Sequence, residues 1–353
     1  MTAVATVAQL DQFDEIIDVR TPPEFAEDHI PGALNLPVLS ADERVQVGTL
    51  YKQTSSFEAK KIGAVLIARN IARHIETYFI NKPKNWRPLI YCWRGGKRSG
   101  SMAHILSEIG WKVARLDGGY KAYRRRVIDD LALWPQRFQF EVVCGPTGSG
   151  KSRFLQALAA SNAQVLDLEL LALHRGSVLG NLPGAPQPAQ KKFDSLIWDQ
   201  LRQFDPARPV YVEAESKKVG QLRVPDALIE RMWQGHCVVL ALPSSQRVQL
   251  LQEEYAHFIA HPQQLLEKID CLKSLHSHER LAYWQDLIAL QRWDDFVLDM
   301  LLQHYDPAYH RSTVKHYPQL DQATQLAVLD SSMQGFLRLA QQFLAHPSPV
   351  LTA

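Results

Sequence analysis

Short apolar runs alternate with helically spaced apolar residues through the first third of the chain. The segments DEIIDVR and RPLIYC place consecutive apolar residues beside polar ones, which predicts buried strands. SGSMAHILSEIG predicts a helix that starts at a serine cap and ends at Gly110. This alternation is typical of an α/β domain with a parallel sheet. The predicted strands are 14–20, 87–92 and 111–119, and the predicted helices lie within 41–82 and at 99–110.

The alternation restarts at residue 138. The strand FQFEVVC leads into a glycine-rich loop and a helix, and three more apolar runs predict further strands. From about residue 244 the pattern is almost wholly helical. The predicted elements are a basic connecting helix at 120–138, strands at 138–144, 164–168, 209–213 and 236–242, and a helix at 151–160.

These patterns predict two α/β domains followed by a helical region, which suits a chain of 353 residues. The expected parts are a parallel-sheet domain at 1–125 with a helical insert at about 41–82, a basic linker helix at 126–137, a second α/β domain at 138–250 and a helical C-terminal region at 251–353.

Composition narrows the class of protein. Hydrophobic residues make up 46% of the chain, and the net charge is only +2, so a nucleic-acid partner must be met by local basic patches. The four cysteines form no CxxC pair, which argues against a zinc site and suits a reducing cytosol. The first 20 residues lack the pattern of a signal peptide, and no apolar run is long enough for a membrane span. We therefore expect a cytoplasmic protein that does not bind membranes.

The loop GPTGSGKS at 145–152 is a complete G-x-x-x-x-G-K-S match between a predicted strand and a predicted helix, which identifies a P-loop. Its glycines let backbone N–H groups wrap an anion, Lys151 adds a positive charge, and Ser152 offers a hydroxyl to Mg²⁺. Glu213 and Glu215 follow a later strand, where an acidic residue helps to hold Mg²⁺. No N-K-x-D signature is present, which argues against a GTPase. The predicted anion-binding residues are Gly145, Gly148, Ser149, Gly150, Lys151 and Ser152.

A second glycine-rich loop follows the strand RPLIYC and contains Cys92. The loop N–H groups and the positive end of the following helix both favour a thiolate at this position. Arg98 can form a forked contact with an oxyanion, and the glycines permit close approach of the backbone. We expect Cys92 and Arg98 to be catalytic, with an anion held by Arg94, Gly95, Gly96 and Lys97.

Three segments together resemble a rhodanese domain, a family that carries a chalcogen on a loop cysteine. They are IDVRTPPEFAEDHIPGALNLP, IYCWRGGKRS and LDGGYKAY. The insert at about 41–82 is longer than in a compact rhodanese. The Cys-x5-Arg spacing is that of cysteine-dependent phosphatases and arsenate reductases, which indicates room for a phosphate-sized group.

A rhodanese domain followed by a P-loop domain resembles the bacterial tRNA 2-selenouridine synthase family. DLELLALHRGSVLG, VEAESKKVG and HYDPAYHRS look like further motifs of that family. The resemblance covers nearly the full chain except its last ~35 residues. It implies a transferase that acts on the wobble 2-thiouridine in a tRNA anticodon loop. Members are thought to geranylate the sulfur from geranyl diphosphate and then to replace the S-geranyl group with selenium from selenophosphate.

The resemblance also suggests roles for the two loops. At Cys92, the thiolate is expected to take selenium from selenophosphate, and the perselenide would then attack C2 of the uridine. The P-loop is expected to hold the diphosphate of geranyl diphosphate, with ATP as the competing ligand. No tightly bound cofactor is expected, and Mg²⁺ through Ser152 is the metal considered. The expected phosphate or substrate contacts are Arg175, Ser177, Glu213, Glu215, Arg247 and Arg311.

For several of these residues, a purely structural role explains the sequence pattern equally well. Arg247 suits a solvated helix arginine as well as a phosphate ligand. The HRGS loop suits a surface loop with a capping serine, and Arg311 with its neighbours suits helix-end packing. The expected tRNA contacts in YKAYRRR, which also suit a solvated basic face, are Lys121, Arg124, Arg125 and Arg126.

Three other functions remain open at this point. The Cys-x5-Arg spacing suits a phosphatase or arsenate reductase, although Tyr91 rather than histidine precedes Cys92. A P-loop kinase or NTPase with an inactive rhodanese-like module is the second, and the intact Cys92 argues against it. A general tRNA sulfurtransferase is the third.

Overall fold

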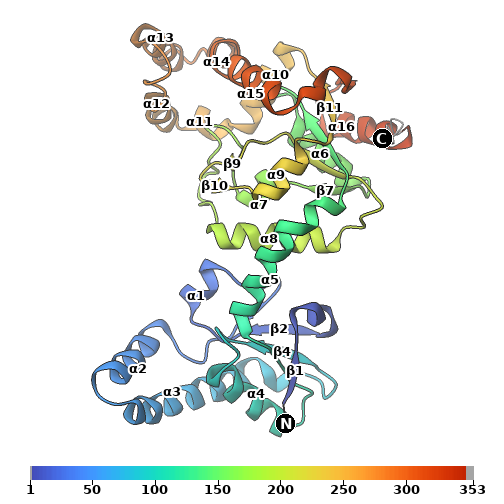
Figure 1. Cartoon of the computed structure of the whole chain (residues 1–353). Coiled ribbons are helices and arrows are strands. Elements are labelled where there is room, and N and C mark those ends of the chain that lie inside the picture. Colours follow the sequence, from blue (N-terminus) through green and yellow to red (C-terminus); the bar gives the residue numbers. More distant parts are fainter. Residues whose placement is uncertain (1, 347–353) are drawn as a thin grey trace. The chain divides into compact units, whose positions relative to one another are not determined.

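Two α/β units make up the structure, a computed structural model that describes residues 2–346. Of the described residues, one unit comprises 2–131 with 188–199, and the other comprises 132–187 with 200–346. Each contains a five-stranded parallel sheet (Figure 1). The predicted α/β class is therefore confirmed. Within the described residues, no helix combines the length and the apolar character that crossing a membrane requires.

In the first unit the strand order is β1-β5-β4-β2-β3, and every neighbouring pair is parallel. Strand β4 is buried along its whole length because it lies at the centre of the sheet, which explains its uninterrupted apolar run. The strands are β1 Ala3–Ala5, β2 Glu15–Asp18, β3 Leu34–Asn35, β4 Pro88–Tyr91 and β5 Ala114–Leu116. The helices are α1 Pro22–Glu27, α2 Ala41–Gln53, α3 Ser56–Thr77, α4 Lys97–Ile109 and α5 Gly119–Leu133, with 3-10 turns at Val7–Gln12 and Phe79–Asn81. The last two residues of α5 and the 3-10 turn Trp134–Arg137 belong to the second unit.

The helical insert forms two helices, because the chain breaks at Thr54 and Ser55. The Ser55 hydroxyl accepts a hydrogen bond from the Glu58 N–H at 3.0 Å and so caps α3. Helix α3 is tied to the rest of the unit by polar side chains. The Asn70 amide donates to the Val38 carbonyl at 3.1 Å, and His74 Nε2 lies 2.9 Å from the Pro37 carbonyl oxygen.

Helix α4 begins two residues earlier than predicted, and its N-cap is Gly96 rather than a serine. The expected capping serine, Ser99, is buried inside the first turn, with its hydroxyl 3.2 Å from Cys92 Sγ and 3.2 Å from the Gly96 carbonyl oxygen. The Ser99 side chain therefore contacts the cysteine and does not cap the helix. Consequently Lys97 and Arg98 belong to the first turn. The predicted end at Gly110 is confirmed, with φ of +113°.

In the second unit the order is β12-β11-β6-β8-β7, and all neighbours are parallel. The strands are β6 Phe140–Cys144, β7 Gln164–Leu166, β8 Val210–Glu213, β11 His236–Ala241 and β12 Thr324–Ala327, with a hairpin of β9 Lys218–Val219 and β10 Leu222–Arg223. The helices are α6 Lys151–Ala160, α7 Leu168–Ala172, α9 Asp226–Met232, α10 Ser244–Glu254, α11 Ala256–Ala260, α12 Pro262–Asp270, α13 His278–Ala289, α14 Trp293–Met300, α15 Asp306–His316 and α16 Met333–Ala345. Helix α8 Gln190–Gln203 spans the division of the units, and Leu301–Tyr305 and Pro318–Gln322 form a π-helix and a 3-10 turn.

The C-terminal part is helical as expected, but it also contains a strand that the pattern did not indicate. Strand β12 pairs with β11, and α16 packs on α6, where the rings of Phe154 and Phe343 lie 6.0 Å apart. Phe336 on α16 is fully buried. The segment without a recognised motif therefore completes the core around the P-loop. Residues 347–353 of the predicted 251–353 region lie outside the described part.

Candidate functional site

Cys92 lies directly after β4, at the start of a loop that ends where α4 begins. Two glycines keep this loop against the turn after β5. A Cβ atom on Gly95, whose φ is +66°, would come within 2.9 Å of the Leu116 carbonyl oxygen. One on Gly119 would come within 2.2 Å of the Cys92 carbonyl oxygen. Glycine is thus required at both positions by close backbone approach as well as by dihedral angle.

The Cys92 loop borders an open cavity of about 490 Å³ in which positive charge dominates. Arg98 forms an ion pair with Glu24, with Nη1 2.9 Å from Oε2. Burial disfavours the Glu24 charge, but the hydrogen bond and attraction from Arg98 hold its pKa at about 2. The cavity is lined by Glu24, Arg44, Cys92, Trp93, Arg94, Gly96, Lys97 and Arg98. It can hold a small polyanion beside the thiol.

Trp93 adds a flat apolar surface to this cavity, which the sequence pattern did not single out. Its ring is 37% exposed and stacks on Tyr120, with centroids 5.2 Å apart. Two charged side chains fix the position of Tyr120. Its hydroxyl donates to Asp28 at 2.8 Å, and the Arg20 guanidinium lies 3.9 Å from its ring centroid. The Trp93 ring is therefore a braced surface on which a planar group can stack.

A basic groove of about 680 Å³ adjoins the Cys92 cavity and shares Arg94 with it. Of the expected tRNA contacts, Lys121, Arg125 and Arg126 line the groove. Arg124 does not, because its guanidinium donates to the Lys191 carbonyl at 3.1 Å and forms an ion pair with Asp194. The other lining residues are Gly118, Ala122 and Asp129.

The P-loop follows β6, and α6 begins at Lys151, as predicted. The Lys151 ammonium donates to the Gly145 carbonyl at 3.0 Å and lies 3.5 Å from Glu213. Burial would lower the pKa of Lys151, but attraction to Glu213 and other acidic groups raises it, so the side chain stays charged. The N–H of Gly145 donates to the Tyr309 hydroxyl at 2.7 Å, which connects the loop to α15.

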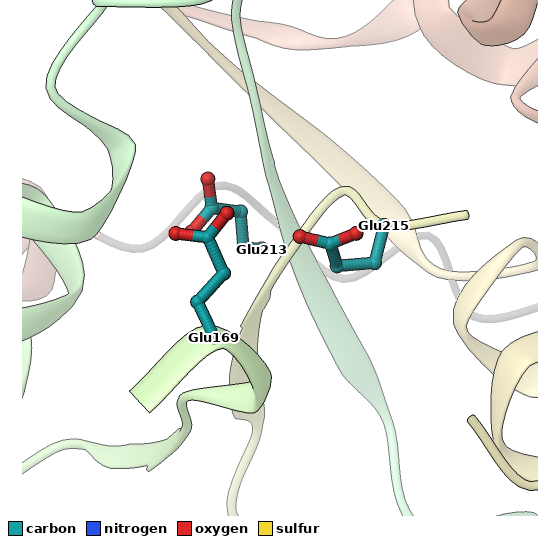
Figure 2. A group of neighbouring side chains, drawn as sticks. All are labelled: Glu169, Glu213 and Glu215. Carbon is teal, nitrogen blue, oxygen red and sulfur yellow. The ribbon is translucent and has the colours of Figure 1, made fainter. Parts of the chain in front are cut away.

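Three carboxylates meet beside the P-loop serine. One oxygen each from Glu169, Glu213 and Glu215 lies within 4.8 Å of the others. Figure 2 shows the three carboxyl groups facing one another, with Glu169 on α7, Glu213 at the end of β8 and Glu215 just beyond it. The Ser152 hydroxyl lies 3.3 Å from Glu169 and 3.4 Å from Glu213. We name Glu169, Glu213 and Glu215 the acidic trio.

Burial and mutual repulsion make the charge of the acidic trio unfavourable. Burial, followed by repulsion from Glu213, raises the pKa of Glu215 to about 8. Burial and the two neighbouring carboxylates raise the pKa of Glu169 well above its usual range. Carboxylate and hydroxyl oxygens are the ligands that Mg²⁺ prefers, and a divalent ion would relieve this repulsion. The acidic trio and Ser152 therefore fit a magnesium ion.

A cavity of about 700 Å³ opens over the P-loop and the acidic trio. Among the expected contacts it is lined by Lys151, Ser152, Arg175, Ser177, Glu213 and Glu215. The Arg175 guanidinium lies 4.8 Å from the ring centroid of Tyr255. Glu169 was not among the expected contacts. Its position just after the strand ending at Leu166, beside a P-loop, is the signal that could have identified it.

Four expected residues are absent from the lining of this cavity, namely Gly145 and Ser149 of the P-loop, Arg247 and Arg311. Arg247 is buried, and its guanidinium donates to the Thr147 carbonyl at 2.7 Å and to Asp306 at 2.6 Å. It ties the P-loop to α15 and so positions the loop. Arg311 lies exposed on α15.

Family models and known relatives match both units. A rhodanese-like domain model matches residues 3–126, and a tRNA 2-selenouridine synthase AAA domain model matches 138–282. A rhodanese-related protein of known structure from Thermoplasma volcanium matches 35% of this chain and 92% of its own, with 14% identity and a TM-score of 0.23.

Three of the relatives that carry the name tRNA 2-selenouridine synthase show the extent of the similarity. The one from Nitrosomonas europaea is 35% identical over 244 residues, which cover 68% of this chain and 63% of the relative. The matched part thus spans less than two thirds of that relative. The one from Hydrogenovibrio crunogenus is 37% identical over 70% of this chain and 72% of its own length. The one from Marinobacter nauticus is 29% identical over 83% of this chain and 87% of its own.

Proposed function

The chain belongs to the tRNA 2-selenouridine synthase family, and we propose that it converts 2-thiouridine in tRNA to 2-selenouridine. The observation that carries this proposal is the basic cavity around Cys92, in a chain that also has a P-loop beside three carboxylates. The first site suits a selenophosphate, and the second suits a diphosphate with Mg²⁺. We propose that the P-loop site geranylates the 2-thio group and that the Cys92 site exchanges S-geranyl for selenium.

At the P-loop, the loop N–H groups and Lys151 bind the diphosphate of geranyl diphosphate, in preference to ATP. The 2-thio sulfur of the uridine attacks C1 of the geranyl group, the C–O bond breaks, pyrophosphate leaves, and the N3 proton of the uridine passes to water. The acidic trio and Ser152 would hold Mg²⁺, which neutralises charge on the leaving pyrophosphate. Arg175 and Ser177 line the same cavity and contact the substrate there.

At the Cys92 site, the loop N–H groups, Arg94, Lys97 and Arg98 bind the phosphoryl end of selenophosphate. If the Cys92 thiolate attacked selenium, it would form a perselenide and release phosphite, because the selenium of selenophosphate is already fully reduced. The electrons balance if the thiolate attacks phosphorus, so that the P–Se bond breaks and selenide is released. Selenide then forms a bond to C2 of the uridine, the C2–S bond breaks, and geranyl thiol leaves with a proton. Water hydrolyses the phosphocysteine to phosphate.

The tRNA anticodon loop lies in the basic groove, and its wobble base stacks on Trp93 after leaving its neighbours. Lys121, Arg125 and Arg126 contact its phosphates.

A variant of the Cys92 site separates the two reactions. Cys92→Ser is expected to lower selenation at least about a thousandfold and to leave geranylation of thio-tRNA unchanged, because only selenation needs the thiol. The exposed Cys271 supplies the control, and Cys271→Ser should retain both reactions. Mass spectrometry of tRNA nucleosides measures both products. Normal selenation by Cys92→Ser would overturn the role of this site.

Lys151→Ala tests the ligand of the P-loop. Titration of geranyl diphosphate and ATP against wild type and this variant should show loss of geranyl diphosphate binding. Tight, Lys151-dependent binding of ATP without binding of geranyl diphosphate would overturn the proposed geranylation.

A further inference from the structure

An apolar cavity of about 60 Å³ lies among the helices that follow β11. Its walls come from α10, α11, α12, α14 and the π-helix 301–305. Most of the lining is aliphatic or aromatic. The lining residues are Thr147, Leu179, Leu251, Gln252, Tyr255, Phe258, Ile259, Leu265, Trp293, Phe296, Val297, Met300, Leu301 and Tyr305.

This cavity adjoins the P-loop cavity. Thr147, Leu251, Tyr255 and Tyr305 line both. Thr147 belongs to the P-loop itself, and a Cβ atom on Gly148 would come within 2.8 Å of Leu251, so the P-loop backbone packs directly on α10. One molecule can therefore place an anionic group on the P-loop N–H groups and a tail in the apolar cavity.

The apolar lining of the cavity determines which kind of ligand group it can bind. The Tyr255 hydroxyl already lies 3.3 Å from the Ser177 hydroxyl, which leaves few polar groups for a ligand. A nucleobase buried here would lose hydrogen bonds to water without replacing them. A hydrocarbon chain has no hydrogen bonds to lose, and the transfer of its apolar surface from water into the cavity is favourable.

We propose that this apolar cavity binds the hydrocarbon tail of an isoprenyl diphosphate whose diphosphate lies on the P-loop. The proposal rests on the proposed geranylation, and it adds the site that selects the lipid and its chain length. Leu251 and Tyr255, at the junction of the two cavities, lie beside the first carbons of the chain.

Binding of a graded series of ligands tests this site. Inorganic pyrophosphate and dimethylallyl, geranyl and farnesyl diphosphate are titrated calorimetrically against the full chain with Mg²⁺. Geranyl diphosphate should bind about a hundredfold tighter than pyrophosphate, because its tail leaves water. Val297→Trp, which fills the cavity, should abolish this gain and keep the affinity for pyrophosphate. Leu298→Trp on the same helix is the matched control, because Leu298 is 37% exposed and does not line the cavity.

A second variant keeps the proposal testable if Val297→Trp fails to fold. Ile259 lines the cavity and is only partly buried, and Ile259→Ala should enlarge the cavity and shift the preference about tenfold toward farnesyl diphosphate. Unchanged preference in both variants, or equal affinity for pyrophosphate and geranyl diphosphate, would overturn the proposed cavity. If geranyl diphosphate binding depends on Lys151 but not on Val297, only the cavity assignment fails. If no isoprenyl diphosphate binds, the proposed geranylation fails with it.

Discussion

The Cys92 loop and the P-loop have the same local form and opposite electrostatic surroundings. Both connect a buried parallel strand to a helix through glycines that let the backbone approach an anion. The lining of the Cys92 cavity holds Arg44, Arg94, Lys97 and Arg98 against the single acid Glu24. The P-loop cavity is lined by five acidic side chains, Asp167, Glu169, Glu213, Glu215 and Glu254, against Lys151, Arg153 and Arg175.

Under the proposed function, this difference gives each of two anionic substrates its own charge environment. The Cys92 cavity attracts a polyanion with protein charges alone. In the P-loop cavity, under the proposed function, a divalent cation would offset the carboxyl groups of the acidic trio when a diphosphate binds. We therefore propose that the same glycine-rich geometry supports a metal-independent site in one unit and a metal-dependent site in the other.

Removal of divalent cations is the strongest test of this contrast. EDTA should lower geranyl diphosphate binding and geranylation at least about a hundredfold, because without Mg²⁺ no divalent cation would offset the charge of the diphosphate beside the acidic trio. Selenation of a pre-geranylated anticodon stem-loop should change less than about twofold. Nucleoside mass spectrometry measures both reactions.

A matched pair of variants locates the metal effect. Glu213→Gln should weaken the dependence on Mg²⁺, whereas Glu254→Gln, which lines the same cavity outside the acidic trio, should preserve it. Equal loss of both reactions in EDTA would contradict the contrast between the two loops.

The basic groove gives a smaller effect. The double variant Lys121→Ala with Arg125→Ala should raise the Kd for tRNA about tenfold and reduce the slope of log K against log salt by about 2. Lys60→Ala with Lys112→Ala removes the same charge from exposed positions that line neither the groove nor the Cys92 cavity. A filter-binding series at several salt concentrations measures both. Equal losses would mean that overall charge, and not this groove, attracts tRNA.

The ion pair between Arg98 and Glu24 predicts a pH effect on stability. The pKa of Glu24 is about 2 in the fold against an ordinary 4.5, so its stabilisation is present above about pH 4.5 and is lost as pH falls toward 2. Glu24→Gln should lower the free energy of unfolding by about 1 to 2 kcal/mol at neutral pH, and the difference from wild type should shrink below pH 4.5.

Urea denaturation at a series of pH values measures this difference. Glu27→Gln on the same helix removes an exposed pair with Lys191 and should cost under about 0.5 kcal/mol. A Glu24→Gln effect that stays constant from neutral to acidic pH would show that the carboxylate charge is not its source.

Membership of the tRNA 2-selenouridine synthase family and the α/β class were both readable from the sequence, and both are confirmed. The two loops were readable because strand, glycine spacing and helix are neighbours along the chain. Their form depends on backbone dihedral angles and contacts over a few residues. The position of Lys151 at the first turn of α6 follows from this local pattern.

Only the tertiary structure brought the acidic trio together. Glu169 and Glu213 lie 44 residues apart, and they meet because the parallel pairing of β7 with β8 sets Leu166 opposite Val212. The carboxyl ends of the two strands then share one edge of the sheet, beside the helix that carries Ser152. The partners of Arg247, the strand β12 and the apolar cavity likewise depend on long-range packing. A local pattern specifies each piece of backbone, but register and packing decide which distant side chains share a charge environment.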